Sequence, residues 1–463
     1  MTERATKVIL ITVDSLRADA VGLHGGAGLT PTIDGLGREG VVFEQAFATG
    51  PHTTQSFPGI LGSNYPTTGG SVQDFGVRVS VAECFRAAGF RTAAFHSNPL
   101  LCRARGYGVG FDTFWDSVSG EEGSAARRRG QRFLQSVGGP AARRFPSLFR
   151  LARRAYRALA RRRTALALPR EDADRIDELA TEWLLGAGDR FFLWIHYMDA
   201  HWPYATRLAD LGEAERAEAR RLSDKALRHP GRLTADDLAR LRQIYLREVQ
   251  YVDDCLGRLF DFLRGNGLWD ETVIALTADH GEAFMEHGLC LHGDLLYDEL
   301  IRVPLIVRAP GPPHEVRRDV ASLIDLGPTL CELAGVTPSR TFEGRSMFAD
   351  RPRKAVFAET AYRMFVSETP RRVALRTAEW KLIRDAERDT EELYHVASDP
   401  GEMRPVSDGG QVLPRLRQLL REHVSRQRPQ FERRAAVQPL SEAEQEAVKA
   451  RLQALGYLDG ADE

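Results

Sequence analysis

The chain has 463 residues, of which 43% are hydrophobic and 27% are charged, and its formal net charge is −1. This length favours a large α/β domain with a smaller second domain over one ordinary compact core. The near-neutral charge gives no electrostatic reason to expect a nucleic-acid or a membrane partner. The five cysteines are scattered and form no CxxC pair, so neither a disulfide framework nor a zinc cluster is predicted.

The N-terminal segment carries no targeting signal that we recognise. Its apolar run, Val8 to Val13, is too short for a signal peptide or a membrane span, and no small-residue cleavage site follows it. We therefore expect a cytoplasmic location.

Short apolar runs that end in polar residues recur along the first two thirds of the chain. Near-continuous apolar runs of this length are typical of strands buried on both faces. Helical patterns such as residues 241–263 lie between them, so we expect a doubly wound, mostly parallel sheet. Ligands bind beyond the carboxyl ends of such strands. The predicted strands cover residues 8–13, 92–95, 191–195, 273–277 and 303–307, and Asp14, His96, His196, Asp279 and His280 follow four of them.

A basic segment interrupts this alternation at about residues 119–170. Residues 142–164 contain nine arginines and no acidic residue, and their apolar residues recur at helical spacing. We favour an inserted helix that packs its apolar face on the core and leaves its arginines in water. The alternative is a peripheral contact with an anionic surface, either membrane lipid or an acidic substrate.

The pattern changes again after Arg353. Short strands are predicted at 355–360, 372–375 and 380–383, which indicates a small antiparallel sheet. Near the end, Ser441 and Glu444 form a capping-box pattern before an apolar helix face that stops at Gly456. The predicted organisation is an α/β domain over 1–353, a small α+β subdomain over 354–430 and a helical tail over 431–463.

Asp14 and the pair Asp279-His280 are candidate metal ligands. Asp14 directly follows a predicted buried strand, although such an aspartate is often only a helix N-cap. Asp279-His280 follows an equivalent strand and offers one oxygen and one imidazole nitrogen, which suits Mn²⁺, Zn²⁺ or Mg²⁺. Either feature alone could be turn chemistry, and their joint occurrence favours a metal site.

Two further segments carry candidate reactive groups. In residues 196–204, HYMDAHWPY, we favour a structural role for His196 and a role for His201 as a proton donor or a stabiliser of anionic oxygens. In residues 50–66, Thr53, Thr54 and Ser56 lead into an apolar helix pattern, and a helix N-terminus favours bound anions. Metal coordination would make such a hydroxyl a nucleophile, but any one of the three could instead be an N-cap.

Together these motifs resemble the sulfatase family of the alkaline-phosphatase superfamily over nearly the whole chain. The resemblance implies an alkaline-phosphatase-like fold and one divalent metal ion (Mn, Mg, Ca or Zn) held by Asp14, Thr53, Asp279 and His280. The matching segments are VILITVDSLRAD (8–19), GPHTTQSFPGILGSNYP (50–66), MDAHWPY (198–204), ADHGEAFMEHGLCLHGDLLYDELIRVPLIVRAPG (278–311) and WKLIRDAERDTEELYHVASDPGE (380–402).

The chain departs from the sulfatase pattern at several positions, including Gln55 where the motif has a proline. Sulfatases carry a cysteine or serine that is oxidised to formylglycine, and that position is Thr53 here, with Thr54 as the alternative if the alignment slips by one. Phe57 stands in place of the motif's arginine. Asp14-Ser15 replaces two adjacent aspartates, and His292 stands where a lysine is expected.

These departures change the expected chemistry. Formylglycine hydrate releases sulfate by collapsing to the aldehyde, which a threonine cannot do, whereas a threonine-bound phosphate is hydrolysable or transferable with a metal's help. We therefore favour hydrolysis or transfer of phosphate esters or diesters through Thr53, with His201 and His292 stabilising the transferring oxygens or protonating the leaving group. A second metal would need a further Asp-His-His set that we cannot assemble without His201, His287 or His292.

Two alternatives remain open at this point. One is a sulfuric ester hydrolase, and the other is a catalytically inactive sulfatase-like protein that binds an anionic ligand. In every case we expect a small-molecule, lipid or glycan ester with an anionic group as the partner, and no nucleic acid.

Overall fold

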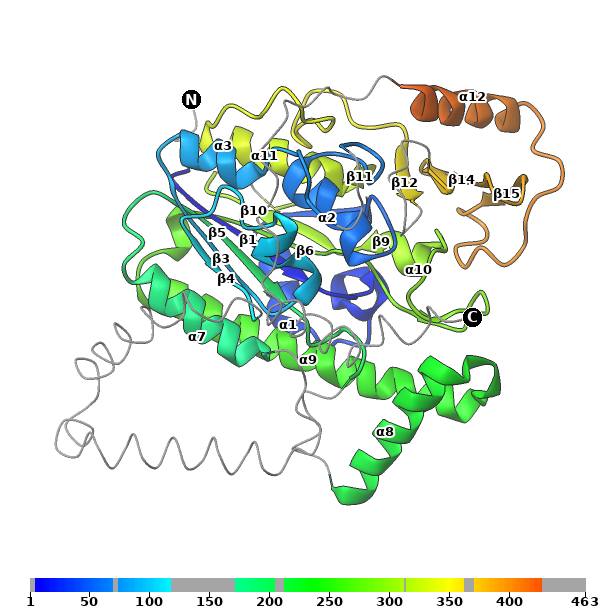
Figure 1. Ribbon diagram of the computed structural model, residues 1–463, viewed down its shortest axis with the longest axis horizontal. Coiled ribbons are helices and arrows are strands. Elements are labelled where there is room, and N and C mark those ends of the chain that lie inside the picture. Colours follow the sequence, from blue (N-terminus) through cyan, green and yellow to red (C-terminus); the bar gives the residue numbers. More distant parts are fainter. Residues whose placement is uncertain are drawn as a thin grey trace.

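A nine-stranded sheet forms the centre of the computed structural model, which describes residues 5–69, 74–117, 171–204, 212–311, 314–361 and 370–426 (Figure 1). The strand order is β11-β2-β10-β6-β1-β5-β3-β4, with β9 paired to β2. Only β9 and β10 run antiparallel to their neighbours, so the predicted mostly parallel sheet is confirmed. The strands are β1 Lys7–Val13, β2 Val41–Phe47, β3 Arg91–His96, β4 Thr113–Trp115, β5 Phe191–Tyr197, β6 Thr272–Ala278, β9 Arg302–Val303, β10 Leu305–Arg308 and β11 Glu315–Ser322.

The three central strands explain why one edge of the sheet collects polar residues. Every residue of β1, β5 and β6 is buried, as their near-continuous apolar runs predict. Their register places Val13 level with Tyr197 and with Ala278. The chain segments that follow these residues therefore emerge side by side at the carboxyl edge of the sheet.

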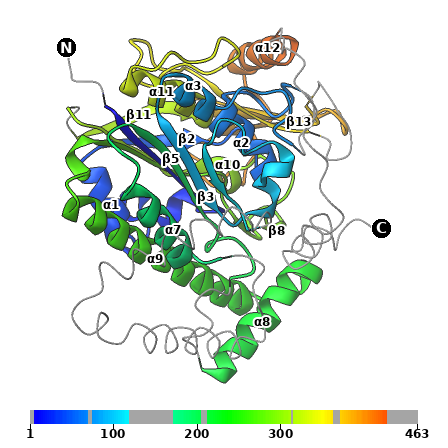
Figure 2. The same ribbon diagram turned by 60° about the vertical axis from the view of Figure 1, so that its left-hand side comes forward.

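Helices cover both faces of the sheet, as Figures 1 and 2 show. One layer holds α1 (Pro31–Arg38), α7 (Ala173–Leu184) and the long α9 (Ala235–Gly265), and α8 (Glu213–Arg228) packs on α9. The other layer holds α2 (Thr53–Gly62), α3 (Val81–Ala87) and α11 (Leu326–Ala334). A capping box of Thr234 and Asp237 begins α9, which contains the predicted helix at 241–263.

Shorter elements connect these layers. They are the 3₁₀ turns Ala18–Ala20, Gly22–His24, Pro99–Leu101, Arg103–Arg105, Pro230–Arg232, Trp269–Glu271 and Leu323–Asp325, the β7–β8 hairpin (Ala283–Phe284 and Cys290–Leu291) and α10 (Asp298–Ile301). Across the described ranges, we find no helix with the length and apolar character that crossing a membrane requires.

A second, four-stranded antiparallel sheet follows the large one in the chain. Its order is β12 (Val356–Thr360), β13 (Arg372–Arg376), β14 (Trp380–Asp385) and β15 (Thr390–His395), and α12 (Val412–Ser425) packs on it. Leu375 and Leu382 of this sheet share a core with Leu416 and Leu420 of α12. The predicted small antiparallel sheet is confirmed, with β15 as an additional strand.

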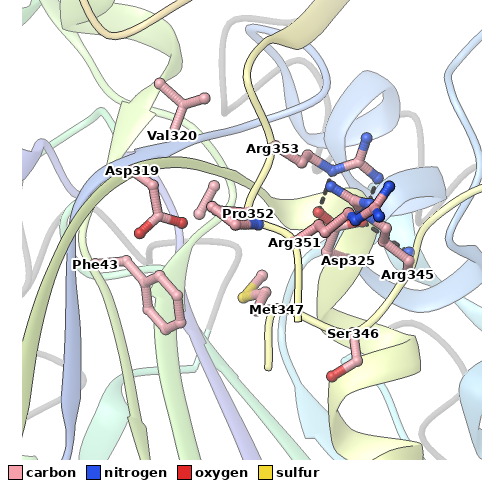
Figure 3. A pocket seen from close by; sticks show the side chains of 11 residues that line it. Phe43, Asp319, Val320, Asp325, Arg345, Ser346, Met347, Arg351, Pro352 and Arg353 are labelled. Atoms are coloured by element: carbon pink, nitrogen blue, oxygen red, sulfur yellow. Dashed lines mark hydrogen bonds and ion pairs between the residues drawn. The ribbon is translucent and has the colours of Figure 1, made fainter. Parts of the chain in front are cut away.

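An ion pair fastens the segment between the two sheets. Arg353 binds the carboxylate of Asp325 through two guanidinium nitrogens, and the backbone N–H of Arg345 donates to the same carboxylate at 2.8 Å (Figure 3). The pocket in Figure 3 is lined by none of the predicted site residues. The domain boundary at 353 stays a prediction, and the basic helix at 142–164 and the helical tail at 431–463 lie outside the described residues.

Candidate metal centre and active site

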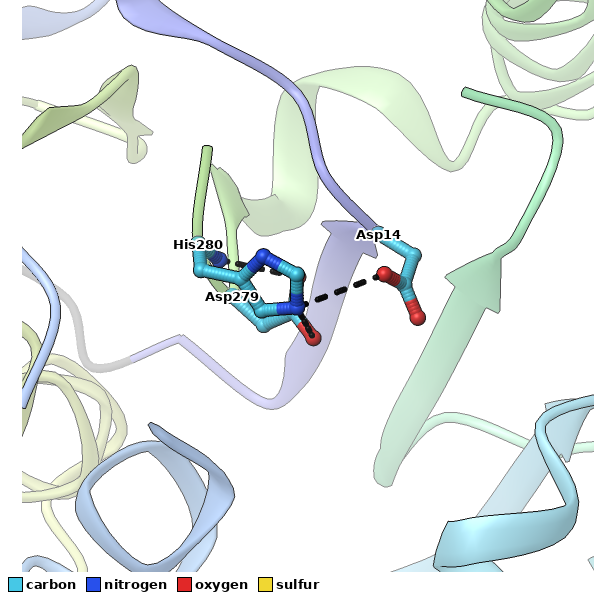
Figure 4. Close-up of side chains that lie close together, drawn as sticks. All are labelled: Asp14, Asp279 and His280. Atoms are coloured by element: carbon cyan, nitrogen blue, oxygen red, sulfur yellow. Dashed lines mark hydrogen bonds and ion pairs between the residues drawn. The ribbon is translucent and has the colours of Figure 1, made fainter. Parts of the chain in front are cut away.

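Asp14, Asp279 and His280 come together at the carboxyl edge of the large sheet (Figure 4). Asp14 follows β1 and the other two follow β6, and all three are fully buried. The Nε2 atom of His280 lies 3.6 Å from Asp14 Oδ1 and 3.6 Å from Asp279 Oδ2, and one ligand atom of each residue lies within 4.8 Å of the others. The fold therefore brings together the three residues that the sequence predicted as metal ligands at the ends of two strands.

The charges of this cluster fit a bound cation. Burial and the neighbouring Asp14 charge raise the pKa of Asp279 well above its usual value. Burial also opposes ionisation of Asp14, but the imidazoles of His201, His196 and His280 outweigh it and lower the pKa of Asp14. Asp279 Oδ2 is buried without a hydrogen-bond partner. A divalent cation would supply the charge that two buried carboxylates need, and a donor set of oxygens and imidazole suits Mn²⁺, Mg²⁺ or Zn²⁺.

Neighbouring polar groups hold the Asp14 carboxylate. Asn98 Nδ2 donates to Asp14 Oδ2 at 2.8 Å, and His196 Nε2 lies 3.3 Å from the same oxygen. Ser15, whose φ is 58°, donates its hydroxyl to Asp14 Oδ1 at 3.1 Å and its backbone N–H to Asp279 Oδ1 at 3.2 Å. Asn98 was not among the predicted site residues. His196, for which a structural role was favoured, is fully buried and also contacts a candidate ligand.

Thr53 is the first residue of α2, and its hydroxyl faces the cluster. Its Oγ1 lies 3.4 Å from His280 Nε2. The N-cap of α2 is His52, so the alternative of Thr53 as an N-cap is wrong. Ser56 donates its hydroxyl to the backbone oxygen of Asp279 at 2.5 Å, which ties the first turn of α2 to the metal-ligand turn. The hydroxyl of Thr53 thus sits at a helix N-terminus beside three candidate metal ligands.

Phe57 lies in a cluster of aromatic rings behind the site. Its ring centroid is 5.3 Å from that of Trp194, 5.2 Å from His196 and 6.3 Å from Tyr107. The side chain is completely buried. The position at which sulfatases carry an arginine is therefore part of the apolar core in this chain.

The two predicted catalytic histidines also lie next to the cluster. The ring centroid of His292 is 4.8 Å from those of His280 and His201. His292 Nδ1 lies 2.9 Å from Glu282 Oε1, and the Tyr204 hydroxyl donates to Glu282 Oε2 at 2.9 Å. Burial raises the pKa of Glu282 to about 7, against the opposing influence of His201 and His280.

His52 and Glu282 are site residues that sequence reasoning did not select. The His52 ring lies edge-on to that of His292, with 5.5 Å between centroids. Their positions carried a signal, because His52 precedes Thr53 and Glu282 follows Asp279-His280-Gly281. The spacing of residues in the sequence did not indicate that the side chains of His52 and Glu282, rather than other polar residues nearby, point toward the candidate metal ligands.

Comparison with known sequences assigns most of the chain to family models. The model described as Sulfatase matches residues 6–336, and the model described as N-sulphoglucosamine sulphohydrolase, C-terminal, matches residues 286–430. The uncharacterized sulfatase YidJ of Escherichia coli is 29% identical over 261 residues, which is 51% of this chain and 51% of the relative. The choline-sulfatase of Rhizobium meliloti is 28% identical over 187 residues, 38% of this chain and 35% of the relative. The matched part is thus about half of these relatives or less.

Solved structures share the fold. The structure of BT4656 in complex with its substrate D-glucosamine-2-N,6-O-disulfate has a TM-score of 0.66 and 20% identity, covering 91% of this chain and 97% of that one. The phosphonate monoester hydrolase of Agrobacterium radiobacter has a TM-score of 0.65 and 20% identity, covering 91% and 95%. With the fold shared over nine tenths of its length and the sulfatase model matching residues 6–336, the chain belongs to the sulfatase family, within the alkaline-phosphatase superfamily.

Proposed function

We propose that this chain is a metal-dependent ester hydrolase in which Thr53 is the nucleophile. The observation that carries this proposal is the Thr53 hydroxyl at the N-terminus of α2, 3.4 Å from His280 Nε2 and beside Asp14 and Asp279. A nucleophile is best placed where an anionic substrate is also stabilised, and a helix N-terminus provides backbone N–H groups for that purpose.

Asp14, Thr53, Asp279 and His280 would hold the metal. A divalent cation bound there supplies Lewis-acid chemistry, lowering the pKa of the Thr53 hydroxyl and offsetting charge on the substrate oxygens. The His292 ring lies 4.8 Å from those of His280 and His201, and we assign His201 and His292 hydrogen bonding to the ester oxygens and protonation of the leaving group. Glu282 orients His292 by holding its Nδ1 atom.

Two classes of ester remain candidates. The comparisons support sulfate esters more than the phosphate esters that the sequence analysis ranked first, because the matching family model and the choline-sulfatase are described by sulfate chemistry. Thr53 favours phosphorus esters, because release from a threonyl sulfate would need slow attack at sulfur. A phosphonate monoester hydrolase with the same fold is consistent with that second class.

The carrier of the ester is also a proposal. Among the similar structures are one with a disulfated glucosamine substrate and a 2-O glycosaminoglycan sulfatase. A sulfated glycan therefore joins small molecules and lipids as a candidate carrier. We also retain two proposals made from the sequence. The first is transfer of the group to an acceptor alcohol in place of water, and the second is a cytoplasmic location.

The test is a comparison of neighbouring threonine variants. Wild type, Thr53→Ala and the matched control Thr54→Ala are loaded with Mn²⁺, Mg²⁺, Ca²⁺ or Zn²⁺ and assayed with aryl sulfate, phosphate monoester, phosphate diester and phosphonate monoester. We expect metal-dependent turnover of one class that falls on the order of 10³-fold or more in Thr53→Ala and persists in Thr54→Ala. Turnover that survives Thr53→Ala with the same bound metal would overturn the mechanism. Bound metal without turnover of any class would favour the anion-binding protein.

A further inference from the structure

Among the contacts between the second sheet and the active-site segments, those of Asp294 lie next to the predicted nucleophile. Asp294 Oδ2 lies 3.2 Å from a guanidinium nitrogen of Arg371, and Arg372 donates to the backbone oxygen of Asp294 at 2.8 Å. Its other carboxylate oxygen, Oδ1, lies 3.2 Å from His52 Nε2. Asp294, in the loop between β8 and α10 that also carries His292, therefore contacts both the arginines at the start of β13 and the segment that begins α2.

Both arginines also pair with acidic residues at the end of β14 or in the turn after it. Arg372 begins β13, is 8% exposed and donates from Nε to Asp385 Oδ2 at 2.7 Å. The adjacent Arg371 donates from Nε to Glu387 Oε2 at 2.7 Å. A planar guanidinium that contacts one acid with Nε and a second acceptor with another nitrogen has little freedom to move. Asp294 is thus held by two arginines at the start of β13 that are themselves paired.

Asp294 in turn acts on the residues that surround the nucleophile. It follows His292 by two positions in the chain, and its partner His52 directly precedes Thr53. His52 is the N-cap of α2, yet its side chain makes no cap hydrogen bond. Its ring lies edge-on to His292, and its centroid is 6.5 Å from that of His280. The contact with Asp294 is therefore one of the contacts that hold the side chain next to Thr53.

We propose that Asp294, anchored by Arg371 and Arg372, is a positioning residue that fixes His52 and the His292 loop around Thr53. The second sheet is then a working part of the active site, because it determines how closely the α2 N-terminus and the His292 loop approach each other. Placement errors of about 1 Å at a reacting centre cost on the order of 10²-fold in rate. The kinetic test of this inference rests on the proposed function. The structural claim, that Asp294 holds His52 and the His292 loop in place, can be tested without turnover.

The kinetic test uses variants of Asp294 and Arg371 in the full chain. We expect Asp294→Asn and Arg371→Met to lower kcat on the order of 10–100-fold while KM and metal content stay close to wild type. Arg371→Lys should recover part of the loss, since it can still place a cation near Asp294. The matched control is Arg384→Met, because Arg384 lies in the same sheet but pairs with Asp389 and Glu391.

A second readout does not depend on turnover. Hydrogen exchange of the peptides covering residues 50–56 and 287–299 should accelerate in Asp294→Asn and Arg371→Met, but not in Arg384→Met. Unchanged exchange and an unchanged kcat in the first two variants would overturn the proposal. A wild type without turnover on any ester would count against the proposed function alone, and hydrogen exchange would then decide the positioning claim.

Discussion

Phe57 occupies the position of the sulfatase motif's arginine and lies in the apolar core. Its ring packs against Trp194, His196 and Tyr107 and has no exposure to solvent. An arginine at this position would place a charge among rings without a carboxylate built to receive it. Burying an unpaired charge costs several kcal/mol, so the substitution also loses stability.

We therefore predict that Phe57→Arg lowers the free energy of unfolding by about 3 kcal/mol or more. The conservative Phe57→Leu should cost about 1–2 kcal/mol, because it loses packing without burying a charge. Urea denaturation followed by circular dichroism measures both. A Phe57→Arg protein as stable as wild type that also gained aryl-sulfate turnover would show that the ring cluster admits a charge.

At the level of residues, the sequence predicted the members of the buried cluster better than the residues that hold them. Asp14, Thr53, Asp279 and His280 were recognisable because each follows a strand or begins a helix within a motif. Asn98 was not recognisable. It lies two positions after β3, and the order of the strands in the sheet, which brings it to Asp14, cannot be read from the residues around it. The distinction between a core histidine and a site histidine also failed at His196, which is both buried and in contact with Asp14.

At the level of elements, a buried charge cluster joins α10 to β14. Lys381 of β14 lies 2.7 Å from Asp298 Oδ1 and 2.7 Å from Glu402 Oε1 and is fully buried. Burial and the Asp298 charge raise the pKa of Glu402 from 4.5 to about 7, although Lys381 opposes the shift. Because the folded-state pKa is raised, folding is favoured where Glu402 is protonated.

The pH dependence of stability follows from this sign. The contribution of Glu402 is fully present below its unfolded pKa of 4.5 and is lost as pH rises through about 7. We expect the free energy of unfolding to fall by about 1–3 kcal/mol from this group between pH of about 5 and about 8. Denaturant titrations at both pH values should show a smaller fall in Glu402→Gln, with the exposed Glu379→Gln as control. An identical fall in wild type and Glu402→Gln would contradict the assignment.

The elements themselves were predictable where burial was uniform. Strands β1, β3, β5 and β6 were predicted from apolar runs, because parallel strands buried on both faces need apolar residues throughout. The edge strand β11 was missed, because half of its sequence EVRRDVAS is charged and its first five residues are exposed or half-buried. Strand β2 was also missed, because the polar residues Glu44 and Gln45 interrupt its apolar run. The antiparallel direction of β10 follows a connection from β6 that holds the β7–β8 hairpin, α10 and β9, and it has no signature in the residues of β10 itself.

At the level of the whole molecule, the site lies where the two sheets meet. The large sheet supplies Asp14, Asp279 and His280 from the ends of β1 and β6, and α2 supplies Thr53. Arg371, which precedes β13 of the second sheet, pairs with Asp294 of the loop after β8. Parallel-sheet enzymes bind ligands at this edge, so the shared fold positions the candidate site.

The central claim is that Thr53 receives the group removed from the substrate. Its most direct measurement is rapid-quench mass spectrometry of the metal-loaded protein with whichever aryl ester it turns over. We predict a covalent phosphoryl or sulfuryl group on the peptide containing Thr53, formed as fast as the first product and absent in Thr53→Ala and in metal-free protein. Full turnover with no modification of Thr53, or with the group attached to another residue, would contradict this account.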